Sequence, residues 1–179
     1  KKLISRLKKG VHVNGIPYSE WYEAHKVTEE ELKKQRKKVF EYQPKFSIIV
    51  PTYNTPIPFL REMIDSVVAQ TYPNWELCIG DGSEGNPELE QVLAEYAAKD
   101  TRIKYQILEK NFGIAGNTNG ALELATGEYV GLFDHDDLLT LDCLFEVVKS
   151  LQEVHHDIIY TDEDKITMDG KEHFQPHFK

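Results

Sequence analysis

Three carboxylates lie within four positions at the end of a short apolar run. The run and its acidic end read Glu-Tyr-Val-Gly-Leu-Phe-Asp-His-Asp-Asp over residues 128–137, so the acids are Asp134, Asp136 and Asp137. The apolar part has the length of a buried strand, and ligands bind just outside the carboxyl ends of strands in open α/β sheets. Carboxylates at such a place can hold a hard divalent cation against phosphates. The alternative is a solvated turn in which Asp136 or Asp137 caps a helix from Leu138 onward, but a cap needs only one carboxylate.

Polar segments also follow two other strand-like runs. After the first run, residues 51–56 form a loop with two prolines, in which Tyr53 could stack on a nucleobase while Asn54 reads its edge. After the second, Asp81 stands between two glycines and can accept a hydrogen bond from a base N–H or a ribose hydroxyl. Ordinary strand-to-helix turns explain each segment equally well. Their recurrence at successive strand ends favours a shared ligand crevice.

A glycine-rich segment, residues 111–120, follows the third strand-like run and opens a helical pattern. Its glycines would let the backbone approach a diphosphate at a helix N-terminus, with Asn117 or Asn119 bonding the ligand. The spacing does not fit Gly-x-Gly-x-x-Gly, which disfavours a nicotinamide-dinucleotide fold. A flexible loop with an Asn cap is the structural alternative.

The elements that must position these residues alternate between two kinds. Helical spacing of apolar residues separates the strand-like runs and predicts right-handed crossovers between parallel strands. We therefore expect an α/β fold, a doubly wound, mostly parallel sheet of the Rossmann-like kind with helices on both faces. The expected strands are residues 46–50, 75–79, 103–107, 129–133 and 158–160.

The first 44 residues differ in composition and pattern from the rest. They are charged and read as a helical N-terminal extension, so we expect domains at residues 1–44 and 45–179. Residues 1–9 mix five basic with three apolar side chains. They form either a solvated terminal helix or a small amphipathic element that contacts a membrane surface.

Composition excludes several classes of protein. The net charge of -9 argues against non-specific nucleic-acid binding, and the two cysteines, Cys78 and Cys143, lie in apolar runs typical of buried thiols. No stretch approaches the ~20 apolar residues that a transmembrane helix needs, and no signal peptide opens the chain. We expect a cytoplasmic protein, with the inner face of the membrane as a possible location.

The ordered set of motifs resembles the family-2 glycosyltransferases, inverting enzymes of the GT-A fold that build bacterial polysaccharides. The resemblance covers residues 46 to about 165, and it is specific as a set although each piece is weak. Residues 160–165, Tyr-Thr-Asp-Glu-Asp-Lys, resemble a subgroup of rhamnosyl- and other hexosyltransferases. The motifs are Ile48 to Asn54, Ser66 to Tyr72, Trp75 to Leu77, Asp81 to Ser83, Ala125 to Tyr129 and Asp134 to Asp137.

The resemblance implies roles for individual residues. Pro51, Tyr53 and Asn54 would line the nucleotide pocket, and Asp81 would contact the base. Asp136 would bind Mn²⁺ or Mg²⁺ at the donor diphosphate, with Asp134 supporting it near the ribose, and Asn119 matches a position that is often polar in relatives. Two departures stand out: Gly80 replaces an Asp of many members, and Thr118 replaces a basic residue, which leaves more of the diphosphate charge to the metal.

The implied activity is transfer of a sugar, with inversion, from a UDP- or dTDP-linked donor to a bacterial polysaccharide, glycan or lipid-linked saccharide acceptor. The catalytic base of relatives lies in a later Glu-Asp motif, which we expect beyond Lys179, so the chain is expected to be truncated before the acceptor segment. Two alternatives remain: a sugar nucleotidyltransferase, and a non-catalytic nucleotide-sugar-binding or interaction module. A nucleotidyltransferase usually has a basic, glycine-rich loop after its first strand, whereas the first basic residue here is Arg61.

Overall fold

The computed structural model describes residues 11–178, and the basic segment at residues 1–9 lies outside this range. Contacts divide the chain into two compact units. One unit is Glu30–Val154, and the other joins the two ends of the chain, Lys1–Glu29 and His155–Lys179. The domain boundary expected after residue 44 stays a prediction, because a division by compact packing does not by itself define domains.

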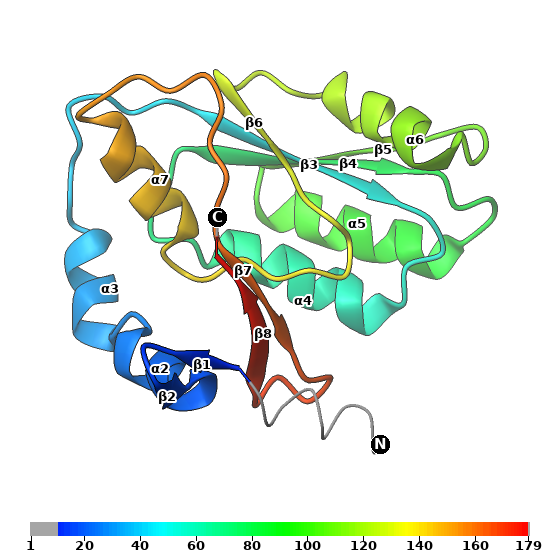
Figure 1. Ribbon diagram of the computed structural model, residues 1–179. Helices are drawn as coiled ribbons and strands as arrows, with labels where there is room; N and C mark the ends of the chain where they lie inside the picture. Colours follow the sequence, from blue (N-terminus) through cyan, green and yellow to red (C-terminus); the bar gives the residue numbers. More distant parts are fainter. Residues whose placement is uncertain (1–10, 179) are drawn as a thin grey trace, which may run out of the picture. The chain divides into compact units, whose positions relative to one another are not determined.

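The central unit is built around a four-stranded sheet (Figure 1). All neighbouring strands are parallel, in the order β5-β4-β3-β6. Four of the five expected strands are therefore confirmed. They are β3 (Phe46–Thr52), β4 (Trp75–Asp81), β5 (Ile103–Ile107) and β6 (Tyr129–Leu132).

Helices cover both faces of this sheet. Helices α4 (Ile57–Val68) and α5 (Pro87–Lys99) lie on one face, whereas α6 (Gly113–Leu122) packs on β3 and β4 from the other (Figure 1). Two further helices are α3 (Glu29–Gln35) and α7 (Cys143–Leu151). The predicted α/β fold with a parallel sheet between helices is confirmed.

The core follows from the apolar runs of the two central strands. Every residue of β4 is buried, and all but one of β3 are buried. Strands that are covered on both faces read as continuous apolar runs rather than as alternating patterns. Ile49, Leu77 and Ile79 accordingly have no exposed surface.

Glu76, one of the two acidic residues in β4, is 1% exposed. Its carboxylate accepts hydrogen bonds from Ser47 Oγ at 2.7 Å and Lys104 Nζ at 2.9 Å, and it also pairs with Lys45. Burial disfavours the charged carboxylate, but these partners outweigh burial and hold the pKa of Glu76 well below its usual range. Because Ser47 and Glu76 lie near the amino ends of β3 and β4, this cluster ties the strands together at the edge opposite the loops expected to bind ligand.

Among the residues that the structure describes, the unit that joins the two chain ends contains two hairpins and a helix. Its elements are β1 (His12–Val13), β2 (Ile16–Pro17), α2 (Tyr18–His25), β7 (Glu163–Ile166) and β8 (His173–His177). Asn14 and Gly15 have φ of 52° and 84°, as a two-residue hairpin turn requires. A turn at Asp169 and Gly170 connects β7 to β8.

The strand expected at residues 158–160 is wrong. These residues belong to no strand, and Ile158 and Tyr160 are each 75% exposed. A strand needs a paired neighbour for its backbone groups, and an apolar triplet does not supply one. Within residues 11–178, every helix is too short or too polar to span a bilayer.

Candidate functional site

The order of the strands creates a switch point between β3 and β6. From β3 the chain moves outward through β4 to β5, and α6 then returns it to β6 on the other side of β3. Loops at such a point diverge and leave a crevice outside the carboxyl ends of the strands. The loop with Tyr53 and Asn54 leaves β3 here, and the loop with Asp134 and Asp136 leaves the neighbouring β6.

Asp81 lies at the carboxyl end of β4 and has no exposed surface. Its Oδ1 accepts hydrogen bonds from Thr52 Oγ1 at 2.8 Å, Ser83 Oγ at 2.7 Å and Ser83 N at 3.2 Å. Its Oδ2 is buried too, but it has no partner within residues 11–178. A buried carboxylate oxygen without a donor is costly, so Asp81 is poised to accept a hydrogen bond from a bound molecule.

The loop after β3 is locked to this carboxylate. Asn54 N donates to Ser83 Oγ at 2.6 Å, and Asn54 takes the left-handed conformation, with φ of 50°, that Asn tolerates better than most residues. Tyr53 is 49% exposed, whereas Pro51 is half-buried within β3. The loop therefore presents an aromatic ring to solvent from a fixed backbone, as stacking on a base requires.

The structure separates the two asparagines of α6. Asn117 is 2% exposed, its Oδ1 accepts from Phe112 N at 3.0 Å, and its Nδ2 donates to Asn111 Oδ1 at 3.1 Å and to Thr52 O at 3.3 Å. Asn119 is exposed and keeps its amide available for a ligand. Asn117 is thus occupied in joining α6 to the end of β3.

Gly80 has a packing role that explains its departure from the Asp of many relatives. A Cβ at Gly80 would lie 2.3 Å from Asn117 O and 2.7 Å from Ala121 N, both backbone atoms of α6. Side chains cannot occupy this space unless the helix moves. The glycine therefore allows α6 to approach the sheet closely.

The acidic loop after β6 is a turn whose carboxylates face solvent. Asp137 N donates to Asp134 O at 3.3 Å, and the side chain of Asp136 is 61% exposed. Helix α7 begins at Cys143, so the alternative in which Asp136 or Asp137 caps a helix from Leu138 onward is wrong. No group of three or more His, Cys, Asp or Glu side chains within residues 11–178 is arranged to hold a metal ion.

Asp134 and Asp136 nevertheless supply the right kind of donor for one class of metal site. Mg²⁺ and similar ions use hard oxygen ligands, and Mg²⁺ is usually held by one or two carboxylates together with substrate phosphates rather than by a cage of protein ligands. Two exposed carboxylates on one turn beside a switch point fit this pattern. Their part in metal binding stays a prediction.

Sequence reasoning missed the supporting roles that three residues play in the site. Thr52 and Ser83 orient Asp81, and Asn117 fixes the loop before α6. The Asp81-Gly82-Ser83 spacing carried a partial signal, because a Ser two residues after an Asp can bond back to it. The contribution of Thr52 depends on the register in which it faces Asp81 across the sheet.

Fold and site together define an α/β domain of the class that binds ligands at the carboxyl edge of a parallel sheet. The family model for glycosyl transferase family 2 matches residues 47–178. The chain belongs to this family.

Relatives among characterised and uncharacterised bacterial proteins support this assignment. The chain is 46% identical over 138 residues to the uncharacterized protein y4gI of Sinorhizobium fredii, which covers 76% of this chain and 15% of that protein. It is 32% identical over 131 residues to the putative teichuronic acid biosynthesis glycosyltransferase TuaG of Bacillus subtilis, which covers 72% of this chain and 50% of that protein. The chain thus spans half or less of the length of these two relatives.

Solved structures agree in fold. TarS of S. aureus, solved in complex with UDP, has a TM-score of 0.55 at 32% identity and matches 61% of this chain and 32% of its own. The mannosyltransferase PcManGT of Pyrobaculum calidifontis, solved with GDP-Man and Mn²⁺, has a TM-score of 0.53 at 28% identity and matches 68% of this chain and 38% of its own.

Proposed function

We propose that the central unit binds the nucleoside diphosphate of an activated sugar and serves the transfer of that sugar to a growing bacterial polysaccharide or another saccharide acceptor. The observation that carries the proposal is the buried Asp81 carboxylate, whose Oδ2 has no donor within residues 11–178. Uracil and thymine each present one ring N–H that such an oxygen can accept. We therefore expect a UDP- or dTDP-linked donor.

Neighbouring groups complete the proposed nucleotide pocket. The half-exposed ring of Tyr53 stacks on the base, while Pro51 and Asn54 shape the wall that carries it. Asp134 lies at the ribose, and Asn119 offers its exposed amide to the donor. The network of Thr52, Ser83 and Asn117 holds these groups in place before the ligand arrives, which lowers the entropic cost of binding.

The proposed reaction is a direct displacement with inversion at the anomeric carbon. The acceptor oxygen forms its bond to that carbon as the bond to the diphosphate oxygen breaks, and the acceptor proton passes to a carboxylate base. A bound Mn²⁺ or Mg²⁺ would supply positive charge that stabilises the departing diphosphate. Asp136, supported by Asp134, is the residue that we expect to hold the ion, and we expect the base in a later Glu-Asp motif beyond Lys179. The cytoplasmic location stays a prediction.

Calorimetric titration of UDP and dTDP into this chain, with Mn²⁺ or with EDTA, tests the proposal. We expect binding that requires the metal and that weakens about tenfold or more, about 1.4 kcal/mol, in Asp136→Asn. Asp157→Asn is the matched control, since it removes the same charge from an exposed carboxylate outside the strand ends. The proposed donor site would be refuted if the folded protein bound neither nucleotide. It would also be refuted if EDTA and the Asp136→Asn substitution both left the affinity unchanged.

A further inference from the structure

The unit that joins the two chain ends contains a cluster of titratable side chains for which the proposed donor site has no use. Asp164 Oδ2 accepts a hydrogen bond from the Tyr18 hydroxyl at 2.7 Å and lies 2.8 Å from His173 Nδ1. An ionised carboxylate can only accept, so Nδ1 carries the proton, and in the neutral form of the ring Nε2 is then the acceptor. The ring of Tyr22 stacks on His173 with centroids 3.7 Å apart, which fixes the plane of the imidazole.

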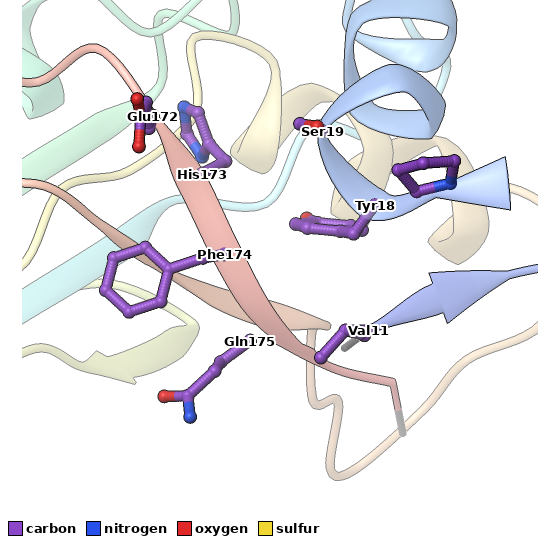
Figure 2. A pocket seen from close by; sticks show the side chains of 8 residues that line it. Val11, Tyr18, Ser19, Glu172, His173, Phe174 and Gln175 are labelled. Atoms are coloured by element: carbon purple, nitrogen blue, oxygen red, sulfur yellow. The ribbon is translucent and has the colours of Figure 1, made fainter. Parts of the chain in front are cut away.

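This cluster borders a pocket of about 260 Å³ (Figure 2). Tyr18 and His173 belong both to the cluster and to the pocket wall. Burial and the Asp164 carboxylate raise the pKa of Tyr18, which keeps its hydroxyl protonated as a donor. Because Nδ1 of His173 is engaged by Asp164 and the residue lines the pocket, Nε2 is the ring nitrogen that a ligand would meet.

A strained residue lies in the same wall. Gln175 has φ of 50°, although it is neither Gly nor Asn and precedes Pro176, where a left-handed backbone is unusual. The pairing of β7 with β8 shifts register opposite Glu163 and Lys165, so β8 carries a bulge here. Bulges and strained backbone recur next to binding sites, where they aim a side chain.

We propose that this pocket binds one sugar ring of the saccharide acceptor, with His173 Nε2 accepting a hydrogen bond from a sugar hydroxyl. Asp164 and Tyr18 act as positioning residues, because they hold the imidazole in the tautomer that accepts. The aromatic and planar polar side chains around it suit a ligand with an apolar ring face and many hydroxyls. These side chains are Tyr18 and Phe174, with Ser19, Glu172 and Gln175.

Size and position narrow the ligand further. The pocket volume falls just below the lower end of about 300 Å³ that ligand pockets usually have, which suits one ring better than an oligosaccharide. Part of the wall, from Val11 to Ser19, lies outside the residues 47–178 that match the family model. The family match therefore covers only the β8 side of the pocket, and the assignment of the pocket to the acceptor rests on the proposed function.

Nitrogen NMR of the histidine rings in the 179-residue chain tests the inference without any substitution. Methyl glycosides of rhamnose, glucose and N-acetylglucosamine are titrated to about 50 mM, since few contacts give only about millimolar affinity. We expect His173 to start as the Nδ1–H tautomer and at least one glycoside to shift its Nε2 signal. His177 is the internal control, because it lies on the same strand, is exposed and does not line the pocket. Absence of a His173 shift, or equal shifts at both histidines, would overturn the inference.

A substitution separates binding from folding. Gln175→Gly removes the pocket side chain and relieves the left-handed strain, so we expect a higher melting temperature together with a glycoside response at least several-fold weaker. A higher melting temperature with unchanged glycoside binding would overturn the role of the bulge in recognition. UDP titration of the same samples distinguishes the two proposals: UDP binding without a glycoside response refutes only this inference, and the reverse result refutes only the donor site.

Discussion

Replacing Gly80 by Ala should damage the central unit far more than such a small change suggests. The new Cβ would lie 2.3 Å from Asn117 O and 2.7 Å from Ala121 N, whereas non-bonded heavy atoms prefer about 3.5 Å or more. Both obstructing atoms belong to the backbone of α6, so no side chain can rotate away. The helix would have to lift from β4 by roughly 1 Å, which would also stretch the bond from Asn117 Nδ2 to Thr52 O.

The expected cost lies at the upper end of the range for overpacked cores, about 3 kcal/mol. Gly131 offers a matched control in β6 of the same sheet, because a Cβ there would meet nothing within 4 Å. Gly131→Ala should be neutral or stabilise by about 0.4–1 kcal/mol through the unfolded state. The two variants should therefore differ by about 3–4 kcal/mol.

Urea unfolding followed by tryptophan fluorescence measures this difference. The chain has two tryptophans, and Trp75 is 1% exposed in the central unit, so a Trp21→Phe background makes the signal specific to that unit. With a urea dependence of about 2 kcal/mol per M, Gly80→Ala should lower the midpoint by about 1.5 M. Equal midpoints for Gly80→Ala and Gly131→Ala would refute the argument that α6 leaves no room at β4.

Two further predictions concern buried polar groups. Glu76→Gln should destabilise the central unit by about 2–4 kcal/mol, whereas Glu95→Gln, which breaks an exposed pair with Arg61, should leave stability nearly unchanged. Because the pKa of Glu76 is depressed, its contribution to stability is present above the unfolded-state pKa and is lost as the pH falls below about 4. The free energy of unfolding should therefore fall less steeply with decreasing pH in Glu76→Gln than in the unchanged chain. An identical pH profile for the two would contradict this. Asn117→Ala should cost about 1–3 kcal/mol in urea unfolding, because Phe112 N loses its partner and Thr52 O keeps only its hydrogen bond from Gly82 N. Asn119→Ala should leave stability within about 0.5 kcal/mol while weakening nucleotide binding, and a reversed pattern would exchange the roles of the two asparagines.

The parallel sheet could be predicted from the sequence because each of its strands is marked by a local run of apolar residues. Residues 46–50 and 75–79 are apolar apart from one polar residue each, and the intervening helices repeat apolar residues at helical spacing. The same criterion failed at residues 158–160, which are apolar but lack a neighbouring strand. It also left residues 163–177 unassigned, because β7 and β8 are polar and depend on each other for their backbone hydrogen bonds.

The site divides in a similar way. Its loops could be predicted, since polar turns after successive strands must gather at one edge of a parallel sheet. The burial and the hydrogen-bond partners of each side chain could not be predicted in this way. From the sequence, Asp81 suited a surface turn and a buried hydrogen-bond acceptor equally well. Only the tertiary structure, in which Thr52 and Ser83 donate to its carboxylate, shows that it is a buried acceptor.

The amino-acid sequence by itself determined the fold class, the order of strands and helices and the loops that carry the candidate site, because these depend on local patterns of apolar and turn-forming residues. The tertiary structure alone decided which of two asparagines, two positions apart on α6, is buried, since residues at that spacing point to different sides of a helix. It also decided that Gly80 must lack a side chain and that Tyr18, Asp164 and His173 share one hydrogen-bonded cluster. These contacts join residues up to 146 positions apart, so their energies depend on distances that no local pattern records.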